Sequence, residues 1–233
     1  DCLLSRGLGD VYKRQANGLS NAFSVLVISE KGCLLSAPDT YMEKIVIGSN
    51  LPKNLMDIDN GVEKNIKLLG EAKNKKISDI NACVLKRPRH DKIVKILKKM
   101  NVNINYITDG DIAGALSVIG DKPKNDIYYS TGGGPEGVIV AAALSCYGGQ
   151  IQGRLVLNED EKVRAKKLGI KDFNKKYNID DMVKGDVIFC ATGVTSGDLA
   201  SGVKDLGNEF EVNTFSLHKS QNIIKSVRNI YNK

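Results

Sequence analysis

Apolar positions along the chain follow two periods that alternate. Short runs of aliphatic and β-branched residues predict strands, and apolar residues spaced three or four apart predict amphipathic helices. We expect strands at residues 23–29, 44–48, 82–85, 102–107, 127–130, 151–157, 187–191 and 210–217. We expect helices at residues 60–72, 90–100, 112–119, 135–146 and 159–168, while the last 15 residues fit a strand and a helix equally.

The alternation of strand and helix between residues 82 and 147 predicts an α/β fold with a largely parallel sheet. Residues 30–32 form a turn signal after the first strand, which predicts a hairpin with a return strand at residues 33–35. The antiparallel strands of that hairpin would make the sheet mixed. No internal repeat and no cluster of Pro or Gly marks a domain boundary.

Composition narrows the function classes. The net charge is +7, but the lysines are interleaved with acids, so we interpret most of them as solvated helix faces and expect the excess to favour an anionic metabolite. Trp is absent and aromatic residues make up 6% of the chain, which argues against base-stacking nucleic-acid sites. No apolar run reaches the roughly 18 residues that a membrane span needs. Five cysteines without a CxxC pair argue against a thiolate zinc site and suit the reducing cytoplasm.

The first 15 residues, DCLLSRGLGDVYKRQ, show neither period and no helix-capping pattern. The string GLGDVYKRQ resembles translated sequencing-adapter read-through at the end of a fragmentary gene. We therefore expect residues 1–15 to be a non-native leader that precedes the domain at residues 16–233. The alternative is an ordinary flexible leader, and the DNA upstream of codon 16 distinguishes the two.

Three loops at the carboxyl ends of expected strands carry the candidate chemistry, because ligands of open α/β sheets bind there. In the first loop Arg87 and Arg89 flank Pro88, which fixes the backbone in an extended turn. A pair of guanidinium groups suits bidentate capture of phosphate oxygens. The alternative is a solvated strand end with surface arginines.

The second loop holds Asp109, Gly110 and Asp111. Two carboxylates on either side of a glycine can hold a cation or accept hydrogen bonds from sugar hydroxyl groups. The alternative is a turn in which Asp111 caps the helix that follows.

The third loop, TGGGPEG at residues 131–137, follows a strand and opens a helix, with Pro135 where a first-turn proline is favoured. Consecutive glycines expose backbone N–H groups, and a helix N-terminus attracts anions. Glu136 would repel a bare phosphate but not a phosphate that carries a divalent metal ion. The loop therefore favours a metal–phosphate site.

The same loop matches the pattern G-x-G-x-x-G through Gly132, Gly134 and Gly137, so a dinucleotide-dependent oxidoreductase is the rival hypothesis. Glu159 is the nearest candidate for the acid that binds the ribose. Pro135 and Glu136 argue against the rival, because they lie where the pyrophosphate must approach. A non-catalytic module that binds anions through the basic charge is a third hypothesis.

Two further segments are less specific. Tyr41 has a hydroxyl group that can reach a ligand, although a tyrosine at a strand edge is the more common interpretation. The loop at residues 192–198 is interpreted as a turn and cap.

Six segments together resemble the class II fructose-1,6-bisphosphatase family. They are ANGLSNAFSVL (16–26), APDTYMEK (37–44), RPRHD (87–91), DGD (109–111), GGGPEG (132–137) and ATGVTSGDL (191–199), in the family's order and spacing. The resemblance covers residues 16–233. It implies a mixed-sheet, layered α/β fold of the lithium-sensitive sugar-phosphatase type, here N-terminally truncated.

The resemblance also implies an activity, namely hydrolysis of the 1-phosphate of fructose 1,6-bisphosphate with Mn²⁺ or Mg²⁺, in the gluconeogenesis of the cytoplasm. It implies a homo-oligomer when intact, with no nucleic-acid or membrane partner; sedoheptulose 1,7-bisphosphate would fit the same loops. Glu136 would be a metal ligand. The residues that would hold the sugar bisphosphate are Tyr41, Arg87, Pro88, Arg89, Asp109, Gly110, Asp111 and Gly133.

One departure from the family concerns the metal. The family's other metal ligands are acidic residues upstream, ending in an Asp-Pro-x-Glu-Gly-Thr segment just before ANGLSNA, and residues 9–15 here contain no such segment. Because the single carboxylate of Glu136 cannot organise a two-metal hydrolytic site, we expect this chain to be an inactive fragment. Restoring the upstream region is expected to restore metal-dependent hydrolysis.

Overall fold

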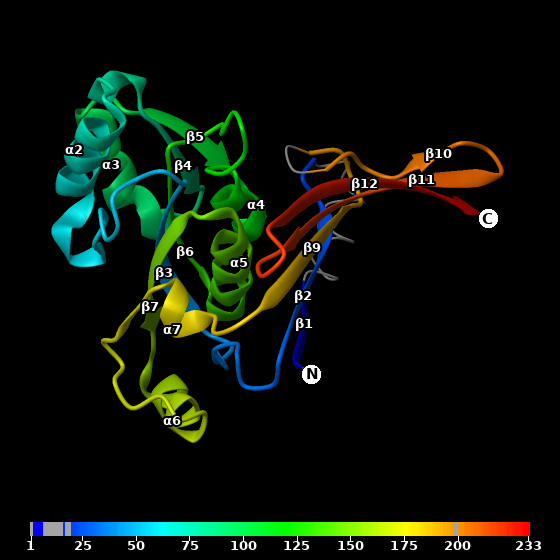
Figure 1. Cartoon of the computed structure of the whole chain (residues 1–233). Coiled ribbons are helices and arrows are strands. Elements are labelled where there is room, and N and C mark those ends of the chain that lie inside the picture. Colours follow the sequence, from blue (N-terminus) through cyan, green and yellow to red (C-terminus); the bar gives the residue numbers. More distant parts are fainter. Residues whose placement is uncertain (1, 7–15, 17–19, 198–199) are drawn as a thin grey trace. The chain divides into compact units, whose positions relative to one another are not determined.

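The computed structural model describes residues 2–6, 16, 20–197 and 200–233 (Figure 1). Contacts divide the chain into two compact units. The central unit is Leu35–Val183, and the flanking unit joins Asp1–Leu34 to Lys184–Lys233. The chain enters and leaves the central unit at adjacent points, because the Leu35 N–H donates to the Met182 carbonyl at 2.8 Å.

The central unit is built on a mixed six-stranded sheet in the order β5-β4-β6-β3-β7-β8. Its strands are β3 (Tyr41–Ile47), β4 (Asn81–Leu85), β5 (Asn103–Ile107), β6 (Ile127–Gly133), β7 (Gln150–Val156) and β8 (Lys176–Tyr177). Strand β4 pairs parallel to both β5 and β6, whereas β3 pairs antiparallel to both β6 and β7. Strand β8 is antiparallel to β7.

Helices cover both faces of this sheet (Figure 1). Helices α2 (Gly61–Lys73) and α3 (Asp91–Lys99) lie on one face, and α4 (Asp111–Leu116) and α5 (Gly134–Tyr147) lie on the other. Shorter elements complete the unit: η1 (Ile58–Asn60), η2 (Ile77–Asp79), η3 (Pro88–His90), α6 (Glu159–Lys167) and α7 (Ile179–Met182). The three layers agree with the layered α/β fold expected from the sequence.

Strand residues alternate between the two faces. Ile45 and Tyr129 belong to the core cluster that also contains Ile66 and Leu69 of α2. Met42 and Lys44 point the other way, toward α5, where a Cβ on Gly137 would meet both side chains. A charged residue of β3 is therefore directed into a buried layer.

Helix α5 has no polar face, and its residues Gly137–Leu144 are all buried. It lies against the sheet and also contacts α4 and α7, so apolar side chains are needed all round. This packing fixes the position of the α5 N-terminus, which is the end that carries the glycine loop.

The flanking unit is an antiparallel sheet in the order β1-β2-β9-β11, in which β10 and β12 both pair with β11. Its strands are β1 (Cys2–Arg6), β2 (Phe23–Ser29), β9 (Val187–Gly193), β10 (Lys204–Asp205), β11 (Glu209–His218) and β12 (Ile223–Asn232). The final segment is thus a strand, which resolves the ambiguity in the sequence pattern. Among the described residues, no helix is both long and apolar enough to cross a bilayer.

The expected helices and most of the expected strands are confirmed, with ends that shift by a few residues. The hairpin at residues 23–35 is wrong. Both edges of β2 are occupied by β1 and β9, so the chain after the turn has no free edge of β2 to pair with. Instead the Lys184 N–H donates to the Cys33 carbonyl at 2.7 Å.

The sheet of the central unit is mixed for a different reason than the one expected. The antiparallel character comes from β3, which lies between β6 and β7, and the parallel part is limited to β5, β4 and β6. The short β8, α7 and β10 were not expected.

In the leader, Cys2–Arg6 forms β1 against β2, although no strand period marks it. Residues 7–15 lie outside the described residues, and the origin of the leader stays a prediction.

Candidate functional site

The three candidate loops meet at one edge of the central sheet. Because β5, β4 and β6 are parallel, the residues that follow Leu85 and Ile107 lie at the same edge as the glycines that end β6. Strand β3 runs the other way and begins there, with Tyr41 opposite Gly133. The topology therefore gathers the segments that were predicted separately from the sequence.

Arg89 links the first loop to the third. Its Nε donates to the Thr131 carbonyl at 2.7 Å, and its guanidinium carbon lies 4.8 Å from the centroid of the Tyr41 ring. Tyr41 is 51% exposed, so the ring supports the guanidinium group at the surface. Because only Nε is used in this bond, the two amino groups of Arg89 have no partner among the described residues and can bind an anion.

Arg87 links the first loop to the second. Its Nη1 donates to the Thr108 carbonyl at 2.6 Å, and its Nη2 lies 3.8 Å from an Asp109 oxygen. Pro88 begins the η3 turn between the two arginines. Gly110 has φ 84°, a left-handed conformation that glycine adopts without strain as the chain turns into α4.

Asp111 does not cap α4, because it is the first residue of that helix and Gly110 occupies the cap position. Its carboxylate instead turns inward. One oxygen accepts hydrogen bonds from the Tyr128 and Ser130 hydroxyl groups, and the other forms an ion pair with Lys44. The capping interpretation is therefore wrong.

The charge state of Asp111 follows from these contacts. Burial raises the pKa of the carboxyl group, but the Lys44 ammonium group and the hydrogen bonds that the carboxylate accepts lower it more, so the pKa lies below its usual value. Burial together with the negative charge of Asp111 raises the pKa of Tyr128 well above its usual value. Tyr128 thus remains a hydrogen-bond donor to an ionised Asp111.

The glycines of the third loop make room for side chains. A Cβ on Gly132 would lie 2.5 Å from an oxygen of Asp111, and one on Gly133 would lie 1.8 Å from an oxygen of Glu136. A Cβ on Gly134 would lie 3.2 Å from the Pro38 carbonyl oxygen. Each glycine therefore allows a different close approach, and two of the three accommodate a carboxylate.

Glu136 lies in the first turn of α5 and is half-buried. Across residues 2–6, 16, 20–197 and 200–233, no group of three or more His, Cys, Asp or Glu side chains is arranged to hold a metal ion. Glu136 is therefore not part of a group of three or more such side chains among these residues.

His90 was not expected to take part, yet it ties the first loop to the third from within. The side chain is 1% exposed. Its Nδ1–H donates to the Leu85 carbonyl at 2.6 Å, and its Nε2 accepts the Thr131 N–H at 2.8 Å. The second bond requires a neutral ring, since a protonated Nε2 would face another donor.

Acidification is expected to destabilise the central unit through His90. Burial lowers the pKa of His90, against the opposing effect of its bond to Leu85. Between that lowered pKa and about 6.5 the unfolded chain binds a proton that the folded chain excludes, so stability is lost as the pH falls below about 6.5. We expect urea denaturation of His90→Gln to lack this part of the pH dependence. Equal losses between pH 7 and pH 5 in both proteins would contradict the prediction.

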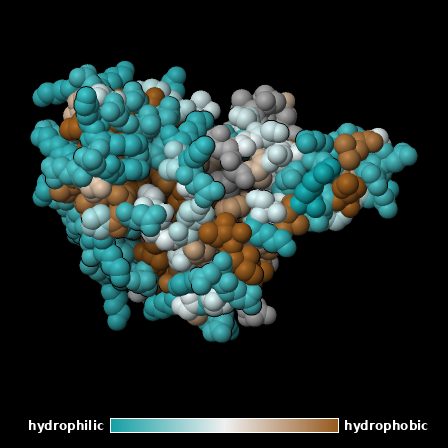
Figure 2. All heavy atoms as spheres, turned by 45° about the horizontal axis from the view of Figure 1, so that its top comes forward, coloured by the Kyte–Doolittle hydropathy of each residue, from teal (hydrophilic) through white to brown (hydrophobic). Residues whose placement is uncertain are grey.

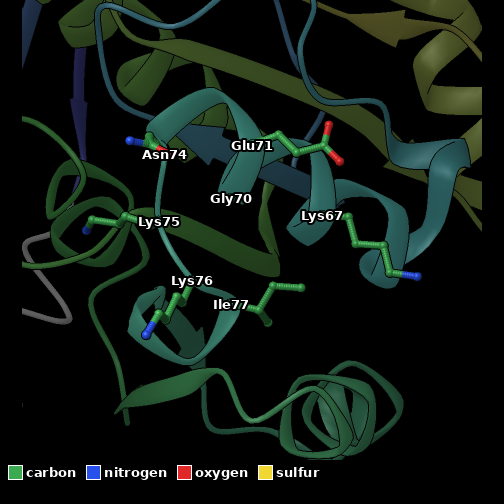
Figure 3. A pocket seen from close by; sticks show the side chains of 7 residues that line it. All are labelled: Lys67, Gly70, Glu71, Asn74, Lys75, Lys76 and Ile77. Atoms are coloured by element: carbon green, nitrogen blue, oxygen red, sulfur yellow. The ribbon is translucent and has the colours of Figure 1, made fainter.

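Many of the lysines of the central unit lie at its surface. The lysines near the ends of α2 and α3 are mostly exposed, as expected, and Figure 2 shows hydrophilic residues over much of this unit. A pocket of about 520 Å³ opens between the end of α2 and η2, where Lys67, Lys75 and Lys76 line it (Figure 3). No residue of the candidate site lines this pocket, so it is separate from the loops at the sheet edge.

The topology around the glycines argues against the dinucleotide hypothesis. In a dinucleotide-binding unit, the strands before and after the helix are neighbours in the sheet. Here α5 connects β6 to β7, and the antiparallel β3 separates these two strands. Glu159 is the first residue of α6, where it pairs with Lys162 at 2.6 Å.

Comparisons with known proteins show which proteins this chain is similar to. A family model described as bacterial fructose-1,6-bisphosphatase, glpX-encoded, matches residues 10–231. The chain is 35% identical to a fructose-1,6-bisphosphatase class 2 of Haemophilus influenzae, over 93% of this chain and 69% of that protein. It is 32% identical to the fructose-1,6-bisphosphatase 1 class 2 of Escherichia coli, over 93% and 68%. A D-fructose 1,6-bisphosphatase class 2/sedoheptulose 1,7-bisphosphatase of Synechococcus is 34% identical, over 94% and 67%.

Proposed function

Since the chain belongs to the class 2 fructose-1,6-bisphosphatase family, we propose that its function is hydrolysis of the 1-phosphate of fructose 1,6-bisphosphate to fructose 6-phosphate and phosphate. The observation that carries the proposal is the family match across residues 10–231. The meeting of the arginine, aspartate and glycine loops at one sheet edge supports it. The oxidoreductase alternative has no support from the comparisons.

The proposed substrate site uses the loops at the sheet edge. Arg87 and Arg89 supply guanidinium groups for phosphate oxygens, and Tyr41 holds Arg89 in place through its ring. Asp109 is exposed beside Gly110 and can accept hydrogen bonds from sugar hydroxyl groups. Pro88, Gly110, Asp111 and Gly133 complete the proposed substrate-binding set.

The proposed metal is Mn²⁺ or Mg²⁺, both of which prefer oxygen ligands such as the carboxylate of Glu136. The remaining ligands would come from water, substrate or protein atoms outside the described residues. We propose the cytoplasm as the compartment, gluconeogenesis as the setting and a homo-oligomer as the intact assembly. Neither nucleic acid nor membrane is proposed as a partner.

Sedoheptulose 1,7-bisphosphate is a second candidate substrate, because the Synechococcus relative is named for both activities. The two sugar bisphosphates share a 1-phosphate, and the arginine loop offers no feature that selects between them.

The function is tested by phosphate release from both sugar bisphosphates with Mn²⁺ and with Mg²⁺. Two proteins are compared: residues 1–233, and a chimera in which the upstream region of the Haemophilus relative precedes residue 16. We expect metal-dependent release by the chimera and much less by residues 1–233, because Glu136 is the one metal ligand that we propose from the described residues. No release by either protein would refute the function, while full activity of residues 1–233 would refute only the need for upstream acids.

Replacing Arg89 by methionine is expected to weaken binding of fructose 1,6-bisphosphate roughly tenfold to a hundredfold, since hydrogen bonds to charged groups contribute about 1.5–3 kcal/mol. Isothermal titration calorimetry measures this without turnover when no metal is present. Arg164→Met is the control, because Arg164 on α6 is 60% exposed and its removal changes the net charge equally. Equal weakening in both variants would show that overall charge, and not the arginine loop, binds the substrate.

A further inference from the structure

A lysine ammonium group lies beneath the glycine loop. Lys44 is the fourth residue of β3, and its side chain is 1% exposed. Its Nζ donates to the Gly133 carbonyl at 2.8 Å and forms an ion pair with Asp111. One buried cation thus contacts both the second and the third loop of the proposed site.

Four side chains, which we call the Lys44 network, are joined around this ion pair: Lys44, Asp111, Tyr128 and Ser130. Lys44 lies directly opposite Ser130 in the β3–β6 pairing, and Tyr128 is two residues earlier on β6, so all three side chains are on the α5 side of the sheet. Asp111 reaches them from the start of α4. The positive charge of Lys44 is balanced by Asp111, and both hydroxyl groups donate to that carboxylate.

A buried ion pair is a poor way to stabilise a fold, because apolar residues of similar volume often stabilise it equally well or better. Such a pair does hold its two partners in one arrangement, since a separated buried charge is very unfavourable. Here the pair joins Lys44 to Asp111, which ends the turn at residues 109–111. Lys44 also donates to the carbonyl group of Gly133, three residues before Glu136. The network therefore fixes the spacing between the two loops.

We infer that Lys44 is a positioning residue of the site, which holds Asp111 of the second loop in a fixed place relative to the third loop. This rests on the proposed function for its consequence in catalysis. Direct contact of Lys44 with a phosphate is excluded by its 1% exposure. Both oxygens of Asp111 accept hydrogen bonds or form the ion pair within the network, and the Asp111 side chain is 12% exposed.

The test replaces Lys44 by methionine, which keeps the volume and removes the charge, and Tyr128 by phenylalanine as a milder change to the same network. Tyr129→Phe is the matched control. Tyr129 is the next residue on β6 and is also buried, but its side chain belongs to the core cluster on the opposite face, near Asn65 and away from the Lys44 network. Native-state amide hydrogen exchange and steady-state kinetics in the chimera are compared for all three.

We expect Lys44→Met to raise exchange of the amides at residues 109–112 and 131–137 more than elsewhere in the central unit. We expect kcat to fall about a hundredfold while KM changes less than threefold, because the arginine loop still binds the substrate. Tyr128→Phe is expected to show smaller changes of the same kind, and Tyr129→Phe none.

Uniform exchange across the central unit, or an unchanged kcat in folded Lys44→Met, would overturn the inference. If Lys44→Met does not fold, Tyr128→Phe decides by the same two readouts. If the unsubstituted chimera releases no phosphate, the proposed function fails, while the exchange measurement still decides whether Lys44 positions the two loops.

Discussion

Asp111→Ala is expected to lower the free energy of unfolding of the central unit by about 3–5 kcal/mol. The substitution leaves the ammonium group of Lys44 buried without its counter-ion, since Lys44 is 1% exposed. It also removes the acceptor of the Tyr128 and Ser130 hydroxyl groups. Urea denaturation followed by circular dichroism measures the change, and if the two units unfold separately, the transition of the central unit is expected to move.

Asp109→Ala provides the comparison, because Asp109 lies two residues earlier but is 50% exposed and 3.8 Å from Arg87. Loss of a surface contact of this kind changes stability by less than about 1 kcal/mol. Combining Asp111→Leu with Lys44→Met is expected to recover most of the stability, because no unpaired charge remains buried. Equal costs for Asp111→Ala and Asp109→Ala would contradict the role of Asp111 as the counter-ion of the buried Lys44.

The sequence predicted the elements that carry the site better than it predicted their contacts. The strand before the glycines and the helix after them were expected because local signals mark both ends, with Pro135 at the start of α5. The meeting of the arginine, aspartate and glycine loops was expected because parallel strands end at one edge. The first prediction depends on short-range patterns, and the second depends on a general rule for parallel sheets.

Lys44 shows what the sequence could not provide. It was expected to be the first residue of a strand, and no motif distinguishes it from the other lysines of the chain. Its partner Asp111 is 67 residues away, and the two meet only because β3 is inserted beside β6. The one available signal was the period of β3, in which Met42, Lys44 and Val46 share a face whose other members are apolar.

His90 was missed for a related reason. A histidine after two arginines suggests a solvated loop, yet this side chain is buried and hydrogen-bonded to the ends of β4 and β6.

The expected hairpin at residues 23–35 was wrong for the opposite reason, since the turn at residues 30–32 is a valid local signal. The edges of β2 were already taken by strands from the two ends of the chain, which no local pattern reveals.

Gly133→Ala is expected to abolish most of the hydrolytic activity with little effect on stability. The Gly133 backbone has φ −58° and ψ 139°, which alanine adopts without strain. The added Cβ would lie 1.8 Å from an oxygen of Glu136, so the carboxylate must move away. Glu136 is the proposed metal ligand, and even mutation of the groups that orient a metal ligand costs roughly tenfold to a hundredfold in metal affinity or activity. Phosphate release by the chimera at a series of Mn²⁺ concentrations measures the loss.

Gly132→Ala is the matched comparison, because the two neighbouring glycines face different carboxylates. A Cβ on Gly132 would lie 2.5 Å from Asp111, which is held by Lys44 and cannot swing away as the end of the Glu136 side chain can. We therefore expect Gly132→Ala to lose stability, by about 1–3 kcal/mol for a forced close contact, and Gly133→Ala to lose activity. Combining Gly133→Ala with Glu136→Gln is expected to cost no more activity than Glu136→Gln alone, since both act on one group. Additive losses would show that Gly133 affects hydrolysis by a route other than the position of Glu136.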